Sequence, residues 1–83
     1  GVTFLYYNPG AKKVEVAGDF TNWTPVELYQ NPNDQNFWGR KLQLPPGSFQ
    51  YKFIINGEEW KNDPLNYTPR HDGTAYNSTF TVQ

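Results

Sequence analysis

The chain lacks several features that would narrow its function. It has no cysteine and no methionine, and His71 is its single histidine. The absence of cysteine excludes disulfides and thiolate-bound metals. No apolar run approaches the roughly 20 residues that span a bilayer, and no signal peptide is visible. Because the chain has no methionine and starts at Gly1, we interpret residues 1–83 as one domain excised from a longer protein.

An excess of charge of one sign is missing as well. Seven basic and eight acidic residues are mixed along the chain, and the net charge is -1. Nucleic acids normally bind a clustered basic face, whereas the longest basic run here is Lys12-Lys13. We therefore expect neither a nucleic acid nor a membrane as a partner.

Aromatic residues, by contrast, are abundant. They make up 18% of the chain, the same share as the charged residues. β-Proteins are often rich in aromatic residues, but a surface with many aromatic and few charged side chains also suits an uncharged polar ligand.

Strand and turn signals alternate along the whole chain, and no segment has a helical period. Short alternating runs at a spacing of ~8–12 residues predict an all-β antiparallel β-sandwich. The expected strands cover residues 2–7, 14–18, 26–29, 38–44, 49–55, 58–62 and 78–82, and residues 31–36 are expected to form a loop.

Residue patterns for catalysis or metal binding are weak. His71 and Asp72 are adjacent, but neighbouring side chains of an extended chain point to opposite sides, and no nucleophile motif accompanies them. The carboxylates occur mostly at turns and strand edges, and no spaced acidic loop like that of an EF-hand is present. We therefore expect a protein that is not an enzyme, with no catalytic residue, no cofactor and no metal site.

Two of the three tryptophans are distinguished by their sequence context. Trp38 is in phase with Leu42 and Leu44, which predicts a core position. Trp23 lies in a polar loop with no strand to turn it inward, and Phe20 is the better anchor for that loop. An exposed tryptophan forgoes roughly 1.5–3 kcal/mol of burial free energy, and a ligand is the usual compensation. The alternative is that Trp23 folds back over one end of the sandwich.

The position of Trp60 depends on the register of a hairpin. A two-residue turn at Asn56-Gly57 would place Trp60 opposite Phe53, on the core face. A three-residue loop at residues 55–57 would place Trp60 opposite Lys52, on the outer face. Local rules leave both registers open.

Several motifs together resemble a known family over about Val2–Gln83. They are Gly-x-Phe-x-Asn-Trp at 18–23, Leu-Pro-Pro-Gly at 44–47, and Tyr-Lys-Phe at 51–53, followed by Asn-Gly, Trp60 and Asp63-Pro64. These motifs are similar to those of the family 48 carbohydrate-binding modules. That family includes the glycogen-binding domain of the AMP-activated protein kinase β subunit and modules attached to amylases, pullulanases and glucan phosphatases. The resemblance implies an immunoglobulin-like antiparallel β-sandwich of the early-set type.

The resemblance also implies a function and a set of site residues. Family members bind α-1,4-glucans such as glycogen, starch and maltooligosaccharides, and they hold an attached catalytic domain on its polymer. Trp23 and Trp60 match the two tryptophans that stack on glucose rings, and Lys52 matches a lysine that donates to sugar hydroxyls. Asn77 matches an asparagine that contacts the ligand, and Thr74 matches a threonine beside it. Trp60 lies on the same face as Lys52 only if the hairpin has the three-residue loop, so the resemblance favours that loop.

Three departures from the family pattern affect these expectations. The hairpin before Trp60 is one residue longer than in many members, and Tyr76-Asn77 replaces a common Asn-Asn pair. Asp72 stands where the kinase domain has an apolar residue that reaches through the sugar coil. We therefore expect no encirclement of the glucan and a modest Kd of ~10 μM to 1 mM.

Two other functions and a cellular location follow from the same residues. The chain could be a structural sandwich that packs on an amylase-type or esterase-type catalytic domain without binding sugar. A protein-interaction sandwich of immunoglobulin type is disfavoured by the missing Cys…Trp…Cys pattern. The isolated module is expected to be a monomer. Asn22, Asn66 and Asn77 each begin a glycosylation sequon. A glycan on Asn22 would block Trp23 and one on Asn77 would lie on the expected site, so a cytoplasmic or bacterial extracellular origin is favoured over a eukaryotic secretory one.

Overall fold

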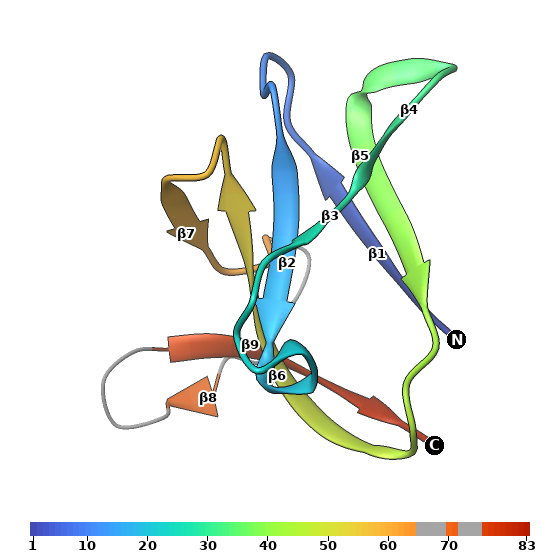
Figure 1. The fold of residues 1–83 in the computed structure, drawn as a ribbon, viewed down its shortest axis with the longest axis vertical. Helices are drawn as coiled ribbons and strands as arrows, with labels where there is room; N and C mark the ends of the chain where they lie inside the picture. Colours follow the sequence, from blue (N-terminus) through green and yellow to red (C-terminus); the bar gives the residue numbers. More distant parts are fainter. Residues whose placement is uncertain (65–69, 72–75) are drawn as a thin grey trace.

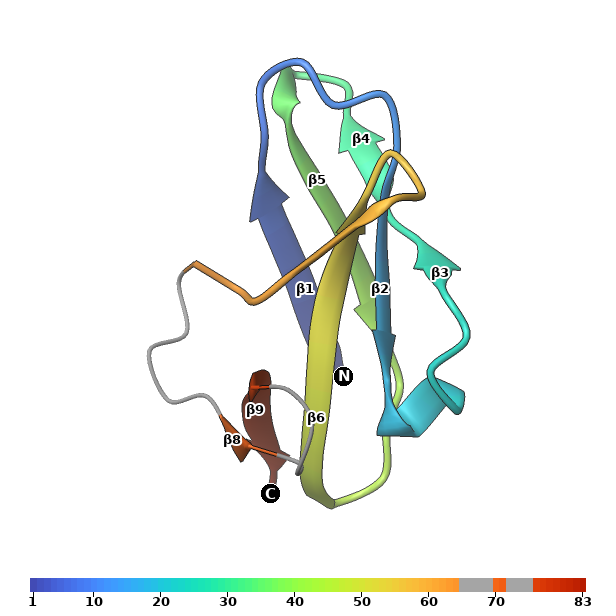
Figure 2. The same ribbon diagram turned by 90° about the vertical axis from the view of Figure 1, so that its left-hand side faces the viewer.

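The computed structural model describes residues 1–64, 70–71 and 76–83. In this part of the chain, two antiparallel sheets pack against each other (Figures 1 and 2), which confirms the expected all-β sandwich. No helix among the described residues is long and apolar enough to cross a membrane.

The two sheets differ in size. The smaller has the strand order β1-β5-β4 and the larger has the order β3-β2-β6-β9-β8, with β7 also paired to β6. The strands of the smaller sheet are β1 (Val2–Tyr7), β4 (Tyr29–Asn31) and β5 (Asp34–Leu42). The larger sheet contains β2 (Val14–Gly18), β3 (Val26–Glu27), β6 (Gly47–Ile55), β7 (Glu59–Lys61), β8 (Arg70–His71) and β9 (Tyr76–Val82).

Strand β6 organises the larger sheet. Its second half pairs with β2 along one edge, while β9 and β7 share the other edge, β9 along residues 47–51 and β7 along residues 53–55. Side chains alternate along a strand, so Tyr51, Phe53 and Ile55 point into the core, while Lys52 points to the outer face. The sequence predicted this alternation.

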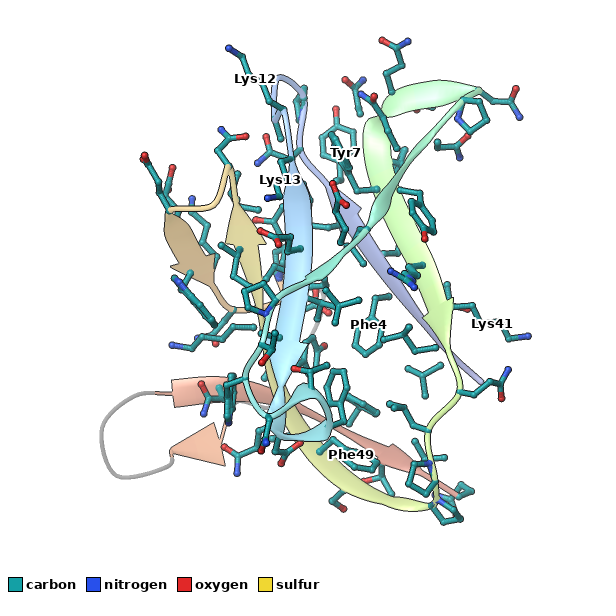
Figure 3. The ribbon with its side chains drawn as sticks, viewed as in Figure 1. Phe4, Tyr7, Lys12, Lys13, Lys41 and Phe49 are labelled. Carbon is teal, nitrogen blue, oxygen red and sulfur yellow. The ribbon has the colours of Figure 1, made fainter. Side chains whose placement is uncertain are left out.

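The core lies between the sheets and is largely aromatic. Phe4 of β1 points into the space between the sheets (Figure 3), where its ring stacks on Phe20 at 5.5 Å and meets Tyr51 edge-on. Trp38 is 7% exposed, which confirms its predicted core position. The buried core cluster comprises Phe4, Tyr6, Val14, Val16, Leu28, Trp38, Tyr51, Phe53 and Ile55.

The segment expected as one strand at residues 26–29 is divided between the two sheets. Val26 pairs with Val16 in the larger sheet, whereas Tyr29 pairs with Gly39 in the smaller one. Leu28 lies at the crossing, is 2% exposed, and its amide donates to the Val14 carbonyl at 2.9 Å. A strand that changes sheets is one way in which a sandwich forms a corner.

The loop expected at residues 31–36 is also shorter than predicted. Strand β4 extends to Asn31 and β5 begins at Asp34, so that Pro32-Asn33 alone forms the turn. The Asn31 side chain accepts from the amide of Asn33 at 2.8 Å and closes that turn. Asparagine and proline suggested a long loop, but this side-chain hydrogen bond allows a tight one.

Candidate functional site

Trp23 lies in a loop with an unusual backbone. Asn22 and Trp23 both adopt the left-handed region, with φ of 58° and 59°. A bulky side chain is rarely found there, and such strain costs of order 1–3 kcal/mol. The Trp23 amide donates to the Gly18 carbonyl at 2.8 Å, which closes the loop. The indole is 37% exposed, as predicted from its sequence context.

The base of this loop is fastened to β6. Strand β2 ends at Gly18, and a single turn of 3₁₀ helix, Asp19–Thr21, follows it. The Asp19 carboxylate accepts from the Gln50 amide, with both oxygens at 3.2 Å. Gly18 leaves no room for a Cβ, which would meet the Gln50 carbonyl and the Phe20 ring. Phe20 packs against the core and anchors the loop, as the sequence predicted.

Trp60 is on β7, and its register differs from the expected one. Trp60 lies opposite Ile54, so the predicted pairing of Trp60 with Lys52 is wrong. The loop consists of residues 56–58 rather than 55–57. The shift is two residues, however, and side chains alternate with period two. Trp60 therefore shares the outer face with Lys52 and is 46% exposed.

Asn56 explains why the loop starts one residue later than expected. Its amide donates to the Lys13 carbonyl at 2.8 Å, and its side-chain oxygen accepts from the amides of Lys12 and Lys13. These bonds hold Ile55 in the strand, opposite Val14. Asn56 and Gly57 then take the left-handed conformations of a tight hairpin turn.

Lys52 and Asn77 come from neighbouring strands of the larger sheet. Lys52 lies opposite Ala17, whose side chain is fully covered although it is on the outer face. The Asn77 side chain donates to Gln50 Oε1 at 3.0 Å. Asn77 is 2% exposed, so it forms part of a wall and does not project from the surface.

These four predicted residues come together. Trp23, Lys52, Trp60 and Asn77 line one open pocket of about 290 Å³ on the outer face of the larger sheet. The contributing elements, which are β6, β7, β9 and the loop after β2, lie on the same side of the molecule in Figure 1. Thr74, also a predicted site residue, and Asp72 lie outside the described residues.

The sequence reasoning missed two supporting residues, Asp19 and Gln50. Gln50 precedes Lys52 by two positions and therefore faces the same side of β6, which is a signal that alternation could have provided. Its backbone binds the Trp23 loop through Asp19, and its side chain binds Asn77. Gln50 thus links the two ends of the pocket.

A second network fixes the chain that follows Trp60. The Tyr51 hydroxyl donates to Asp63 Oδ2 at 2.6 Å, and the Asp63 amide donates to Ser78 Oγ at 2.8 Å. Nearby, burial raises the pKa of the Tyr6 phenol above its usual value, and Asp63 and Glu59 add to the rise while Lys61 opposes it. These contacts hold β7 and the segment after it close to the sandwich.

The chemistry available in the pocket is that of binding. Its lining offers two indole rings, one ammonium group and one carboxamide, with no carboxylate, hydroxyl or imidazole among the lining residues that the structure describes. Within the same described part of the chain, no three His, Asp or Glu side chains are grouped to hold a metal ion. An aromatic ring can cover the C–H face of a sugar, while amine and amide groups donate to its hydroxyls.

The fold is a β-sandwich, and its larger sheet carries two exposed indoles beside amine and amide groups. Residues 2–83 match the family described as the glycogen recognition site of AMP-activated protein kinase, and the chain belongs to that family. The resemblance to the family 48 carbohydrate-binding modules is thereby confirmed.

Individual relatives are similar over three quarters of the chain. The 5'-AMP-activated protein kinase subunit beta-2 of Mus musculus is 38% identical over 63 residues, which are 75% of this chain and 22% of the relative. Subunit beta-1 of Sus scrofa is 39% identical over 62 residues, which are 75% of this chain and 48% of the relative. Subunit beta-1 of Bos taurus is 39% identical over 62 residues, or 22% of its length. The chain thus spans between about a fifth and a half of these relatives.

Proposed function

We propose that the chain binds α-1,4-linked glucans, such as glycogen, starch and maltooligosaccharides, in the pocket of Trp23, Lys52, Trp60 and Asn77. The observation that carries this proposal is the meeting of two exposed indoles, from separate elements, beside an ammonium group. Membership in a family described as a glycogen recognition site supports the same ligand class.

The chemistry of the pocket fits a bent glucose chain. Each pyranose has an apolar C–H face and a rim of hydroxyls, and an indole can stack on the first while Lys52 donates to the second. Trp23 comes from the loop after β2 and Trp60 from strand β7, so two separate platforms are available for a curved chain. A flat row of aromatic residues would instead suit the straight chain of cellulose.

The strain at Trp23 supports a role in binding. A left-handed backbone at a bulky, exposed residue destabilises the fold, and such strain is concentrated at functional sites. Gly18, Asp19 and Gln50 hold the loop in this conformation. We infer that the loop is preorganised, which reduces the entropy lost when the glucan binds.

Within a longer protein, the module would keep an attached catalytic domain close to its polymer. Linking a weak glucan site to an enzyme raises the local concentration of substrate. The isolated chain would act as a monomer, because Trp23, Lys52, Trp60 and Asn77 all come from one copy.

Adsorption to insoluble starch tests the proposal. The wild-type chain should be depleted from the supernatant, whereas Trp23→Ala should remain in it. Tyr7→Ala is a matched control, because Tyr7 is 53% exposed on the other sheet and does not line the Trp23 pocket. If wild type and Trp23→Ala stay equally in solution, the chain is a structural sandwich rather than a binding module.

A further inference from the structure

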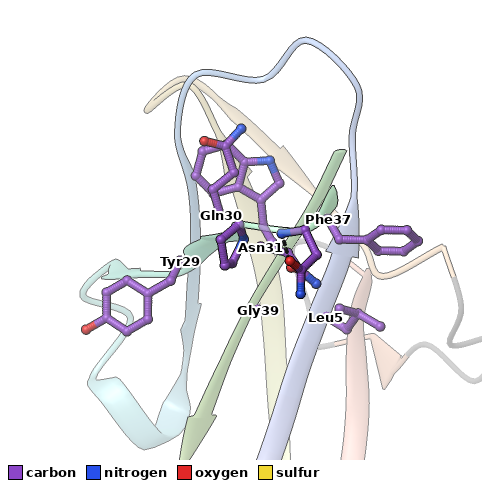
Figure 4. Close-up of a pocket in the computed structure, with 9 residues that line it drawn as sticks. Leu5, Tyr29, Gln30, Asn31, Phe37 and Gly39 are labelled. Carbon is purple, nitrogen blue, oxygen red and sulfur yellow. Dashed lines mark hydrogen bonds between the residues drawn. The ribbon is translucent and has the colours of Figure 1, made fainter. Parts of the chain in front are cut away.

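A larger pocket lies on the opposite sheet, away from the Trp23 pocket. It has a volume of about 390 Å³ and lies over strands β1, β4 and β5 (Figure 4). Its described lining includes Leu5, Tyr29, Phe37, Gln30 and Asn31, and none of its lining residues carries a charge. The pocket therefore combines apolar side chains with carboxamides, which is a composition suited to a neutral polar ligand.

Gly39 forms the floor of this pocket. The register places Gly39 directly between Leu5 and Tyr29 on the outer face of the sheet. A Cβ at Gly39 would come within 3.2 Å of the Phe4 carbonyl and 3.6 Å of Leu5 Cδ1. The missing side chain thus opens a hollow between one aliphatic and one aromatic wall (Figure 4).

Tyr29 is held in place although it is exposed. The Arg40 guanidinium lies over its ring, 5.0 Å from the centroid, and Arg40 Nη1 also donates to the Glu27 carbonyl at 3.0 Å. The Tyr29 side chain is 61% exposed. An aromatic ring fixed on one face by a cation offers its other face as a rigid platform, which lowers the entropy lost on binding.

Within the described part of the chain, each of the two carboxamides in the pocket has one polar atom in a hydrogen bond and one without. Gln30 Nε2 donates to the Gln35 carbonyl and Asn31 Oδ1 accepts from Asn33, which fixes both carboxamides. Gln30 Oε1 and Asn31 Nδ2 have no hydrogen bond among the described residues.

We propose that this second pocket binds a neutral pyranose chain, with Tyr29 as the stacking platform and Gln30 and Asn31 as hydrogen-bonding groups. The ligand class rests on the proposed function, whereas the site itself does not share any residue with the Trp23 pocket. Two sites on opposite faces would let one module engage two branches of the same polymer, so that weak contacts combine.

The test uses a background in which the first pocket is disabled. Amide spectra of isotope-labelled Trp23→Ala are recorded during titration with maltoheptaose. Saturable shifts are expected at Asn31 and Gly39, with a Kd on the order of 1 mM or weaker for a single platform. The shifts should disappear in Trp23→Ala/Tyr29→Ala. They should persist in Trp23→Ala/Tyr29→Phe, which keeps the ring.

Adsorption to glycogen gives a second readout. Tyr29→Ala alone should weaken the apparent affinity of the chain for glycogen about ten-fold, because one of two cooperating contacts is lost. In the wild-type chain, amide shifts at Ala17 and Lys52 during the same titration report binding in the first pocket. The proposed function and the second site are therefore tested independently of each other. Absence of shifts at Asn31 and Gly39 would overturn the second site. Shifts there that depend on protein concentration without sugar would also overturn it and identify a second copy of the chain as the occupant.

Discussion

At the scale of single residues, Trp23 shows how stability and binding oppose each other. Its indole is exposed, and its backbone is held at φ 59°, where only glycine is unstrained. Both features lower the stability of the free chain, and both place an aromatic ring where a ligand can reach it.

Comparing Trp23→Gly with Trp23→Ala separates the free-energy cost of the backbone strain from the loss of the indole contacts. Both variants lose the indole, but only alanine keeps the left-handed penalty, which is about 1–2 kcal/mol. Trp23→Gly should therefore be more stable to urea than Trp23→Ala by about that amount, and neither should adsorb to starch. Equal unfolding free energies for the two variants would contradict the backbone strain.

Gly18 provides a second prediction at this scale. A Cβ at Gly18 would collide with the backbone of β6 and the Phe20 ring, so Gly18→Ala should lower the free energy of unfolding by about 1–3 kcal/mol. Gly39→Ala is the matched control, because its closest contacts, at 3.2 and 3.6 Å, need only a small shift. Urea denaturation should rank Gly18→Ala well below Gly39→Ala, and the reverse order would be inconsistent with the packing.

At the scale of elements, the β6–β7 hairpin decides where Trp60 lies. Asn56 and Gly57 form the turn, the Glu58 amide donates to the Ile55 carbonyl at 3.1 Å, and Glu59 is the first residue paired with β6. Glu58 is thus the extra residue of this hairpin, and it is accommodated without turning Trp60 over.

Deletions in the hairpin test this account. Removing Glu58 leaves a two-residue Asn56-Gly57 turn with Ile54 still opposite Trp60, so starch adsorption should be retained. Removing Glu58 and Glu59 together brings Trp60 opposite Ile55, on the core face, and adsorption should be lost. Equal adsorption of the two deletion variants would show that the face of Trp60 does not matter.

The same elements show what the sequence could predict. Alternation predicted which face of β6 is buried, because that pattern depends only on the strand period. The pairing of Trp60 and the crossing at Leu28 could not be predicted, because they depend on distant partners. Asn56 is fixed by the backbone of Lys12 and Lys13, and residues 26–31 are shared between two sheets.

The features of the site also divide into those that local sequence context predicts and those that depend on distant partners. The exposure of Trp23 and the anchoring role of Phe20 were predictable from local context. The left-handed backbone of Trp23 and the link from Asp19 through Gln50 to Asn77 were not, because they join three separate segments.

At the scale of the whole molecule, Tyr6 connects the two sheets and makes their packing sensitive to high pH. Its ring contacts Phe53 across the core at 4.7 Å. Burial raises the pKa of the Tyr6 phenol above its usual value of 10.0, so the folded chain holds this proton more tightly than the unfolded chain. The stability linked to Tyr6 is present below pH 10 and is lost as the pH rises through the folded pKa.

Replacing Tyr6 by phenylalanine removes that titration. Unfolding measured in urea between pH 8 and pH 11, a range set around the tyrosine pKa of about 10, should show a smaller loss of stability in Tyr6→Phe than in wild type. Tyr7→Phe is the control, since Tyr7 is exposed. Parallel pH profiles for wild type and Tyr6→Phe would contradict the assigned role.

The central claim is that two exposed indoles on one face of the larger sheet hold a bent glucan. Isothermal titration of the chain with maltoheptaose, with cellohexaose as the straight-chain control, tests it most directly. We expect a Kd of ~10 μM to 1 mM for maltoheptaose, a loss of at least about ten-fold in both Trp23→Ala and Trp60→Ala, and little heat with cellohexaose. Unchanged maltoheptaose binding in either variant, or equal binding of cellohexaose, would contradict it.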